Sequence, residues 1–304
     1  MKKLFLLPIL MIFSQITFAQ SDTVALIFDE PYNSELPRNF RRTDWGLHKK
    51  YTVMPDTTGL SLLYISGSAE FNDLNLPLLL EEINNANIID IDLRQETHGF
   101  TNGMSVSWYG KYDWADTGLS REQMITLEKQ KLDSLYKARI IEVTQVLQKN
   151  KADDTFEKIR DTSFTVISVM TEEELAKKNE IIYFRITAAD HRQPTVWDVD
   201  LFIDYITRIK DKTWFHFHCH AGDGRTTTFM TMYDMMKNAK IVSIDDIIMR
   251  QYLIGGIDLT KDDDFPSWDK QYAIERTAFL KDFYDYCKSN TDNYKTKYSD
   301  WLRK

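Results

Sequence analysis

The chain has 304 residues, 43% of them hydrophobic and 13% aromatic, so it can bury the core of one large domain or two modest ones. The formal net charge is -8, and the first nineteen residues hold two lysines and no acid, so the rest of the chain carries -10. A general binder of nucleic acid or of an anionic membrane is more often basic, and a polyanionic substrate would need a basic pocket within this acidic surface.

The N-terminus has the pattern of a secretory signal peptide over residues 1–19. Two lysines precede an apolar run at 4–13, and a small-residue end predicts cleavage after Ala19. A membrane anchor is the alternative, but the run is shorter than the roughly 20 residues that span a bilayer. We therefore expect an exported protein, periplasmic or secreted, without a stable membrane anchor.

The body of the chain alternates strand-like and helix-like segments after an extended lead-in at 20–60. Apolar periodicity and capping pairs such as Ser120 with Gln123 mark the segments. In chain order they predict a strand at 24–28, a strand at 60–66, a helix at 77–85, a strand at 88–93, a helix at 120–137, β-rich runs at 138–148 and 162–170, a helix at 172–178, a strand at 181–186, a helix at 195–209, a strand at 214–218, and helices at 226–238, 243–255 and 268–289. Strands that alternate with helices predict an α/β fold with a mostly parallel sheet flanked by helices.

Two features are expected to modify this single domain at 20–304. A charged, glycine-free stretch at 149–161 separates the two β-rich runs, which predicts a small inserted β subdomain around 138–171. Polar and aromatic residues at 94–114 follow a core strand, where ligands bind in parallel sheets, so we predict that this loop forms a wall of the site. We interpret His98 as a loop residue that braces nearby backbone.

The chain has two cysteines, Cys219 and Cys287, and an oxidising compartment would permit one disulfide between them. That disulfide would consume the cysteine that the loop around Cys219 is suited to activate. We therefore expect two free thiols, with Cys287 packed in the last helix.

The segment 217–228, Phe-His-Cys-His-Ala-Gly-Asp-Gly-Arg-Thr-Thr-Thr, combines a nucleophile with an anion site. A cysteine attacks as the thiolate, which a free thiol with a pKa of about 8.5 rarely forms at neutral pH. Inward-facing backbone N–H groups, a helix N-terminus and Arg225 would each stabilise both the thiolate and a bound phosphate. The residues expected to bind phosphate here are His220, Ala221, Gly222, Asp223, Gly224 and Thr226.

The residue types at this loop suit phosphoryl transfer without a metal or cofactor. Arg225 can hold two phosphoryl oxygens bidentately and follow the charge that develops on them. The Thr226 hydroxyl can donate to the sulfur, which makes the thiolate a better leaving group in a second step. No group of His, Cys and carboxylates has metal-ligand spacing, and we interpret His216 as a hydrogen-bonded core residue.

The reaction also needs an acid to protonate the leaving alkoxide and a base to activate water. Asp190 lies 29 residues before Cys219, in a segment that Pro194 stiffens between a predicted strand and a capped helix. An isolated aspartate near a proline is usually a surface-turn residue, but the cysteine loop favours Asp190 as the general acid.

A Cys-x5-Arg segment alone is weak evidence, but His218, the two glycines, Thr226 and the strand–loop–helix context strengthen it. With these residues the chain resembles the protein tyrosine phosphatase superfamily, and within it the bacterial cysteine phytases, which are protein-tyrosine-phosphatase-like inositol polyphosphatases. The resemblance covers most of the mature chain, and beyond the loop it rests on residues 39–41, 92–100, 107–110, 113–115, 183–186, 190–191, 250–251 and 254–256.

The resemblance implies a protein-tyrosine-phosphatase-like fold with Cys219 as nucleophile, Arg225 as phosphate clamp and Asp190 as general acid. It also implies substrate contacts from three residues around the pocket: Arg41, Asp113 and His191. The chain departs from the family pattern after Gly255-Gly256, where only Lys261 and Lys270 stand in place of several lysines and Asp262, Asp263 and Asp264 follow.

The function that these residues indicate is hydrolysis of phosphomonoesters of myo-inositol polyphosphates, above all phytate, through a cysteinyl-phosphate. A protein tyrosine phosphatase or a phosphoinositide phosphatase would use the same chemistry and is the alternative. A phosphate-binding module with dead chemistry requires a lost nucleophile, acid or arginine, and a sulfur-transfer domain has no need for Asp190.

Overall fold

The computed structural model describes residues 24–48, 51–209, 212–261 and 266–303. The predicted signal peptide at 1–19 and the acids at 262–264 lie outside these ranges. Within them, no helix combines the length and apolar character needed to cross a bilayer.

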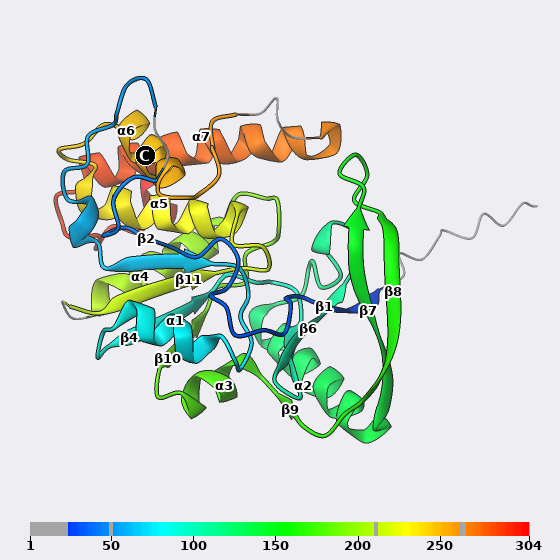
Figure 1. The fold of residues 1–304 in the computed structure, drawn as a ribbon. Coiled ribbons are helices and arrows are strands. Elements are labelled where there is room, and N and C mark those ends of the chain that lie inside the picture. The colour runs from blue at the N-terminus through cyan, green and yellow to red at the C-terminus, as the bar shows by residue number, and fades with distance from the viewer. Residues whose placement is uncertain (1–23, 49–50, 210–211, 262–265, 304) are drawn as a thin grey trace, which may run out of the picture.

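A five-stranded sheet forms the centre of the molecule (Figure 1). Its order is β10–β4–β11–β3–β2, in which only β2 runs antiparallel to its neighbour. This arrangement confirms the predicted α/β fold with a mostly parallel sheet. The strands are β2 (Arg41–Arg42), β3 (Ile65–Ser68), β4 (Ile88–Asp92), β10 (Ile182–Arg185) and β11 (Trp214–His218).

Helices cover both faces of this sheet, as Figure 1 shows. Apolar residues at alternate positions of β4 and β11, such as Ile91 and Phe217, pack with Phe202 and Phe229 in the larger core. The helices of that face are α4 (Val196–Arg208), α5 (Gly224–Asn238), α6 (Ile244–Leu253), α7 (Ser267–Ser289) and α8 (Tyr298–Trp301), and those of the other face are α1 (Leu76–Ile83) and α3 (Glu172–Lys178).

The opposite face of the two central strands is ionisable and not apolar. In the β11–β4 register, His216 pairs with Asp90 and His218 pairs with Asp92, and each is at most 1% exposed. Buried polar groups are stable only with hydrogen-bond or ion-pair partners, so these side chains must pack against other polar or charged groups. His216 finds one in the hydroxyls of Ser66 and Ser68, at 2.9 and 3.1 Å, as a hydrogen-bonded core residue should.

A second, six-stranded sheet has the order β8–β7–β1–β6–β5–β9 and packs against α2 (Arg121–Ala138). Two predictions are corrected here. Residues 94–114 are not a loop throughout, because they contain the β5–β6 hairpin, and the charged stretch 149–161 supplies half of β8. The strands are β1 (Ala25–Phe28), β5 (His98–Thr101), β6 (Met104–Tyr109), β7 (Ile140–Lys149), β8 (Phe156–Thr165) and β9 (Val169–Met170).

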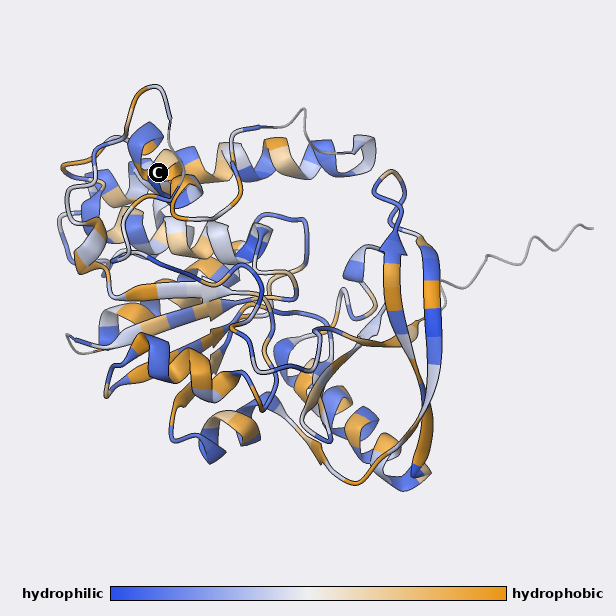
Figure 2. Ribbon diagram, viewed as in Figure 1, coloured by the Kyte–Doolittle hydropathy of each residue, from blue (hydrophilic) through white to orange (hydrophobic). Residues whose placement is uncertain are grey.

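The β7–β8 hairpin, around which a small β subdomain was expected, is part of this second sheet through the pairing of β7 with β1. Its outer strand β8 is almost wholly exposed and largely hydrophilic (Figure 2), which is how an edge strand avoids pairing with other chains. The predicted β-rich run at 162–170 covers the end of β8, but the charged residues at 156–161 gave no apolar alternation and that part of the strand was missed.

The helix boundaries follow local capping. Ser120 and Thr195 each form the predicted capping box, and Ser243 accepts from the N–H of Asp246. α5 begins at Gly224, two residues earlier than predicted, so Arg225 lies in its first turn. Short 3-10 turns, η1 (Leu60–Leu62) and η2 (Lys111–Asp113), replace part of the strand predicted at 60–66 and of the loop predicted at 94–114.

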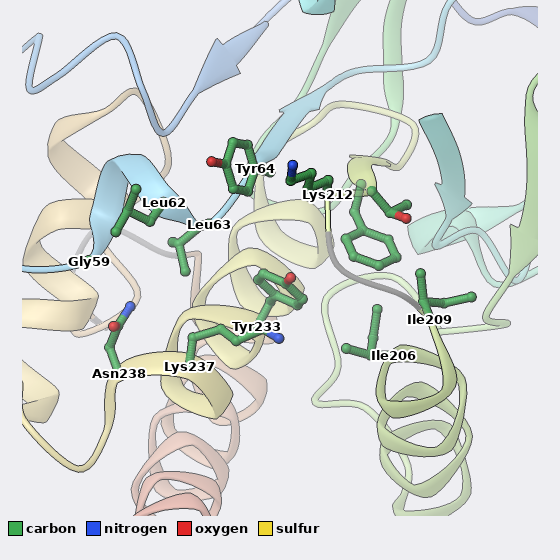
Figure 3. Close-up of a pocket in the computed structure, with 12 residues that line it drawn as sticks. Gly59, Leu62, Leu63, Tyr64, Ile206, Ile209, Lys212, Tyr233, Lys237 and Asn238 are labelled. Atoms are coloured by element: carbon green, nitrogen blue, oxygen red, sulfur yellow. The ribbon is translucent and has the colours of Figure 1, made fainter. Parts of the chain in front are cut away.

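A cavity of about 320 Å³ lies near the start of β11, at the opposite end of the strand from Cys219 (Figure 3). Leu63, Ile206 and Phe215 contribute apolar walls, and Lys212 and Lys237 line it as well. The cavity is therefore separate from the cysteine loop, which follows the end of β11.

A buried ion pair joins α5 to α6. Both oxygens of Asp234 accept from Arg250, one of them from Nε at 2.8 Å, and both side chains are fully buried. Arg250 also donates to the backbone oxygens of Asp56 and Thr58, each at 3.0 Å. This arginine therefore ties the lead-in segment to the helix that follows the cysteine loop.

We expect Asp234→Asn to lower the free energy of unfolding by about 3 kcal/mol, because it leaves the Arg250 charge buried without its counter-ion. Urea denaturation measures the change. The control is the same substitution in the exposed pair of Asp204 with Arg208, where less than about 0.5 kcal/mol is expected. Equal effects at the two positions would contradict the role given to the buried pair.

Candidate active site

The loop between β11 and α5 places Cys219 at the start of a helix. The cysteine is 2% exposed, and its Sγ accepts a hydrogen bond from Thr226 Oγ1 at 3.2 Å, as the sequence predicts. Gly222 has a φ of 74°, and a Cβ there would lie 2.3 Å from the backbone nitrogen of Ala69. Only glycine fits this position. Cys219 and Cys287 are both free and buried, which confirms the prediction of two thiols.

The backbone oxygens of the loop are bound from outside. Ala221 O accepts from Asn39 Nδ2 at 2.9 Å, Gly222 O from Arg41 Nη1 at 2.8 Å, and His220 O from the N–H of Glu70 at 3.3 Å. In a peptide plane the N–H points opposite to the C=O, so the amides at 221–223 are directed toward the interior of the loop. That is the geometry of an anion cradle.

Arg41 therefore has a position that the resemblance did not imply. Its side chain is 1% exposed and lies behind the loop, where Nη1 bonds to Gly222 O and Nη2 donates to Thr227 Oγ1 at 3.1 Å. Burial lowers its pKa to about 10, so it remains charged at neutral pH. In this structure Arg41 supports the cradle from outside and does not line the opening.

Glu96 fixes the orientation of Arg225. The two terminal nitrogens of the guanidinium donate to the two carboxylate oxygens of Glu96 at 2.6 and 3.0 Å, and Nη1 also contacts Ala188 O at 3.2 Å. Burial alone would raise the pKa of Glu96, but Arg225 and Arg94 hold it well below its usual range. The Nε of Arg225 is buried and makes no aligned hydrogen bond, so this edge of the clamp is available to an anion.

Asp190 occupies that edge. Its Oδ1 lies 3.1 Å from Arg225 Nε, and its backbone oxygen accepts from Trp114 Nε1 at 2.9 Å. Burial would raise the pKa of Asp190, but Arg225 and His191 outweigh it and the pKa is lowered. In the ligand-free site, this carboxylate stands where a phosphoryl oxygen could meet the arginine.

Two more predicted residues, Asp113 and His191, stand beside this group. Asp113 Oδ2 lies 3.8 Å from Arg225 Nη2 and accepts from His220 Nδ1, at 3.2 Å. Burial, together with Glu96, raises the pKa of Asp113 to about 6. His191 Nε2 lies 3.4 Å from Asp190 Oδ2. The structure thus brings together Cys219, Arg225, Asp190, Thr226, Asp113, His220 and His191.

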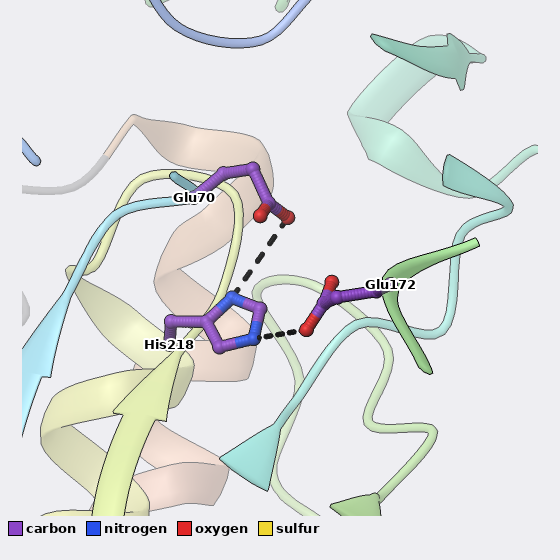
Figure 4. A group of neighbouring side chains, drawn as sticks. All are labelled: Glu70, Glu172 and His218. Carbon is purple, nitrogen blue, oxygen red and sulfur yellow. Dashed lines mark hydrogen bonds and ion pairs between the residues drawn. The ribbon is translucent and has the colours of Figure 1, made fainter. Parts of the chain in front are cut away.

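His218, directly before the nucleophile, is held between carboxylates (Figure 4). Its Nε2 lies 2.7 Å from Glu172 Oε1, and its Nδ1 lies 3.8 Å from Glu70 Oε2. Burial would lower the pKa of His218, but Glu172, Asp90 and Glu70 raise it well above the ordinary value. The residue is therefore a buried imidazolium, which anchors the end of β11 to α3.

Arginines complete this buried ionic layer. Arg94 donates to Asp29, Glu70 and Glu96 at 2.7–2.8 Å. Arg185 bridges Asp92 and Glu128 at 2.9 and 2.8 Å. His98, expected to be a loop residue, is instead in β5 and contacts Glu172 at 2.8 Å. The layer lies beneath the cysteine loop and contacts both sheets.

Three groups within the described residues bring carboxylate and imidazole atoms within 4.8 Å of one another: Glu70–Glu172–His218, Asp92–His98–Glu172 and Glu96–Asp113–His220. Their spacing could hold a cation, although the sequence had suggested no such group. Most of these carboxylates already meet a buried arginine or histidine, so protein cations supply much of the neutralising charge.

Aromatic side chains pack beside the site, where Trp268 at the start of α7 meets the ring of His191. Tyr112 stacks on Trp268 with ring centroids 4.1 Å apart, and Trp268 Nε1 donates to Lys151 O at 3.3 Å. This contact connects the β7–β8 hairpin to the start of α7 (Figure 1). Lys261 is exposed and lies 4.0 Å from Asp258, and Lys270 is half-buried on α7.

Two residues of the site, Glu96 and Asp269, have roles that the sequence reading did not assign. Glu96 lies within the polar segment predicted as a site wall. The sequence feature that could have identified it is a charged residue shortly after a core strand. Asp269 carried no signal, because only the packing of α7 brings it to His191, at 3.0 Å.

Comparison with known proteins supports the family that the sequence resembles. A family model described as inositol hexakisphosphate, that of the PTP-like phytases, matches residues 91–237. The PTP-like myo-inositol phosphatase of Mitsuokella multacida, solved with myo-inositol-(1,3,4,5)-tetrakisphosphate, is 36% identical with a TM-score of 0.86, and the match covers 92% of this chain and 48% of that one. The PTP-like phytase of Bdellovibrio bacteriovorus is 32% identical with a TM-score of 0.71, covering 92% and 95%.

Among curated proteins, the effector protein hopD2 of Pseudomonas syringae pv. tomato is 26% identical over 272 residues, which cover 88% of this chain and 57% of that protein. The chain thus spans about half the length of the Mitsuokella protein and of hopD2, but nearly all of the Bdellovibrio protein. On this evidence, together with the cysteine loop and the fold, the chain belongs to the family of protein-tyrosine-phosphatase-like phytases.

Proposed function

We propose that this protein hydrolyses phosphomonoesters of myo-inositol polyphosphates, phytate above all, through a cysteinyl-phosphate on Cys219. The observation that carries the proposal is the clamp of Arg225. Glu96 fixes its two terminal nitrogens, and Nε is left facing the carboxylate of Asp190 beside the cysteine. A fixed guanidinium edge next to a thiol and an acid suits phosphoryl transfer.

In the first step, a substrate phosphate takes the place of the Asp190 carboxylate at Arg225 Nε and bonds to the amides of the cradle. Its negative charge raises the pKa of Asp190, which favours the protonated acid. The Cys219 thiolate attacks phosphorus, the bond from phosphorus to the ester oxygen breaks, and Asp190 donates its proton to the leaving alkoxide.

In the second step, water attacks the phosphorus of the cysteinyl-phosphate and gives a proton to the Asp190 carboxylate. The sulfur–phosphorus bond breaks and returns the thiolate. The hydroxyl of Thr226, 3.2 Å from Sγ, stabilises that thiolate as it leaves. Inorganic phosphate is the product, and the site returns to its starting state.

The substrate class rests on the relatives and on the charge of the site. The Mitsuokella structure holds a myo-inositol tetrakisphosphate, and the matching family model is described as inositol hexakisphosphate. His191 and His220, whose pKa values carboxylates raise despite the opposing effect of burial, add cationic groups near Arg225. A small polyanion fits these groups, and the signal-like residues 1–19 support its hydrolysis outside the cytoplasm.

We expect Cys219→Ser to reduce phosphate release from phytate by several orders of magnitude, because a hydroxyl is a much weaker acid and a much poorer nucleophile than a thiol. Release of inorganic phosphate is measured with a chelator present and no added metal. Cys287→Ser is the matched control and should retain turnover per folded molecule, since Cys287 packs in α7 away from the site. Full activity of Cys219→Ser would overturn the proposed mechanism.

We expect Asp190→Asn to lower kcat on phytate by about 10²–10⁴-fold, the usual contribution of a general acid. The wild-type rate should fall as pH rises through the pKa of Asp190 in the complex, since the acid must hold a proton. The variant should lose this decline, because asparagine does not titrate. The pH dependence of kcat measures both effects.

An aryl phosphate such as 4-nitrophenyl phosphate provides the internal control for Asp190. Its leaving group needs little protonation, so Asp190→Asn should slow its cleavage much less than that of phytate. If both substrates lose the same factor and the pH profile is unchanged, Asp190 is not the acid.

A further inference from the structure

The first turn of α7 reaches the segment that carries Asp190. Asp269 Oδ2 lies 3.0 Å from His191 Nδ1, and the other ring nitrogen, Nε2, lies 3.4 Å from Asp190 Oδ2. His191 therefore stands between two carboxylates, one on the proposed acid and one on a helix. Asp269 is 3% exposed, and its second oxygen, Oδ1, makes no hydrogen bond.

Other contacts hold this segment at the same place. Arg276, also on α7 and 3% exposed, has Nη1 3.4 Å from His191 O. The ring of Trp268 meets that of His191 edge-on at 4.7 Å. His191 itself has a φ of 64°, a backbone conformation that few residues other than glycine adopt. The side chain is thus held in one orientation by a helix far away in the sequence.

From this geometry we propose that Asp269 is a positioning residue, which keeps the His191 imidazolium protonated and directs its Nε2–H toward Asp190 and the phosphate site. The inference rests on the proposed function, in which Asp190 and Arg225 flank the substrate phosphate. Asp269 touches neither substrate nor the reacting atoms, and it acts only through the histidine.

The charged groups around His191 support a cationic ring. Burial lowers the pKa of His191, but Asp190, Asp269 and Asp154 outweigh it, so the pKa is raised. Arg276 on α7 opposes them, and burial lowers its own pKa. On the side of the cysteine loop, Arg225 contacts Asp190 as well, so the Asp190 carboxylate lies between Arg225 and His191. When the substrate phosphate draws Asp190 away from the ring, Asp269 is the carboxylate that remains bonded to it.

Loss of the Asp269 carboxylate is expected to weaken substrate binding more than it slows the chemical step. Without the Asp269 carboxylate, the imidazole loses a charged hydrogen bond and its proton at neutral pH, and the site loses a cation near the entering polyanion. At acid pH, the ring of His191 should keep its proton without Asp269, because Asp190 and Asp154 still offset the effect of burial on a ring whose unperturbed pKa is about 6.5. The defect should therefore be strong above neutral pH and weak below it.

The test compares Asp269→Asn with wild type on phytate between pH 4.5 and 8. We expect KM to rise about tenfold at the alkaline end, equivalent to about one pKa unit of lost interaction, with recovery at the acid end and a smaller effect on kcat. Asp269→Glu should restore much of the affinity. Asp285→Asn, on the exposed side of the same helix, is the matched control and should change nothing.

A double-mutant cycle and a titration separate positioning from mere structural support. In a His191→Asn background, Asp269→Asn should add no further increase in KM, because Asp269 acts through the ring. NMR titration should show the His191 pKa falling by about one unit in Asp269→Asn, with exposed His48 unchanged.

A pH-independent loss of affinity, additive effects in the cycle, or an unchanged His191 pKa would overturn the proposal. The NMR titration needs no turnover, so it decides the role of Asp269 even if the wild-type protein cleaves none of the phosphate esters. If the protein is active and the titration fails, the proposed function stands and the inference does not. If Asp269→Asn does not fold, Asp269→Ser, which also lacks the carboxylate, carries the titration and should show the same fall in the His191 pKa.

Discussion

The bidentate pair between Arg225 and Glu96 is the interaction on which the site depends. A buried guanidinium is costly unless it is paired, and the pair fixes its plane as well as its charge. Glu96 engages both terminal nitrogens, and Nε faces the carboxylate of Asp190. Arg94 holds Glu96 in turn, through Nε at 2.7 Å. Without this support the backbone of the cysteine loop would remain, but the guanidinium of Arg225 would have no fixed orientation.

The same constraint explains why one face of the central sheet is ionic. Glu70, Asp92 and Glu172 pair with Arg94, Arg185 and His98. Because His98 belongs to β5, the two sheets meet through buried ion pairs as well as through apolar contacts. Such pairs add little net stability, because desolvation offsets their attraction. Their benefit is geometric: each partner has few alternative positions, which keeps the cradle and the acid aligned in the absence of substrate.

The sequence was sufficient for features set by local chemistry: the capped helices, the strand–loop–helix around Cys219, the Thr226 hydrogen bond and the hydrogen-bonded core residue His216. It was insufficient where packing between distant segments of the chain determines the position of a residue. The β5–β6 hairpin was missed although Met104, Val106 and Trp108 alternate with serines in β6, because the polar and aromatic residues around it were interpreted as a loop. The location of Arg41 behind the cradle and the contact of Asp269 with His191 depend on packing between segments far apart in the chain, which no local pattern encodes.

We propose that the cysteine site acts on small inositol polyphosphates. The most direct measurement is kcat/KM of the purified protein, in a chelator and without metal, on phytate, a phosphotyrosyl peptide and phosphoinositide vesicles. The account predicts the highest kcat/KM on phytate, with lower inositol phosphates appearing in chromatographic analysis of the products. Turnover of the peptide or the vesicles with phytate left intact would contradict it.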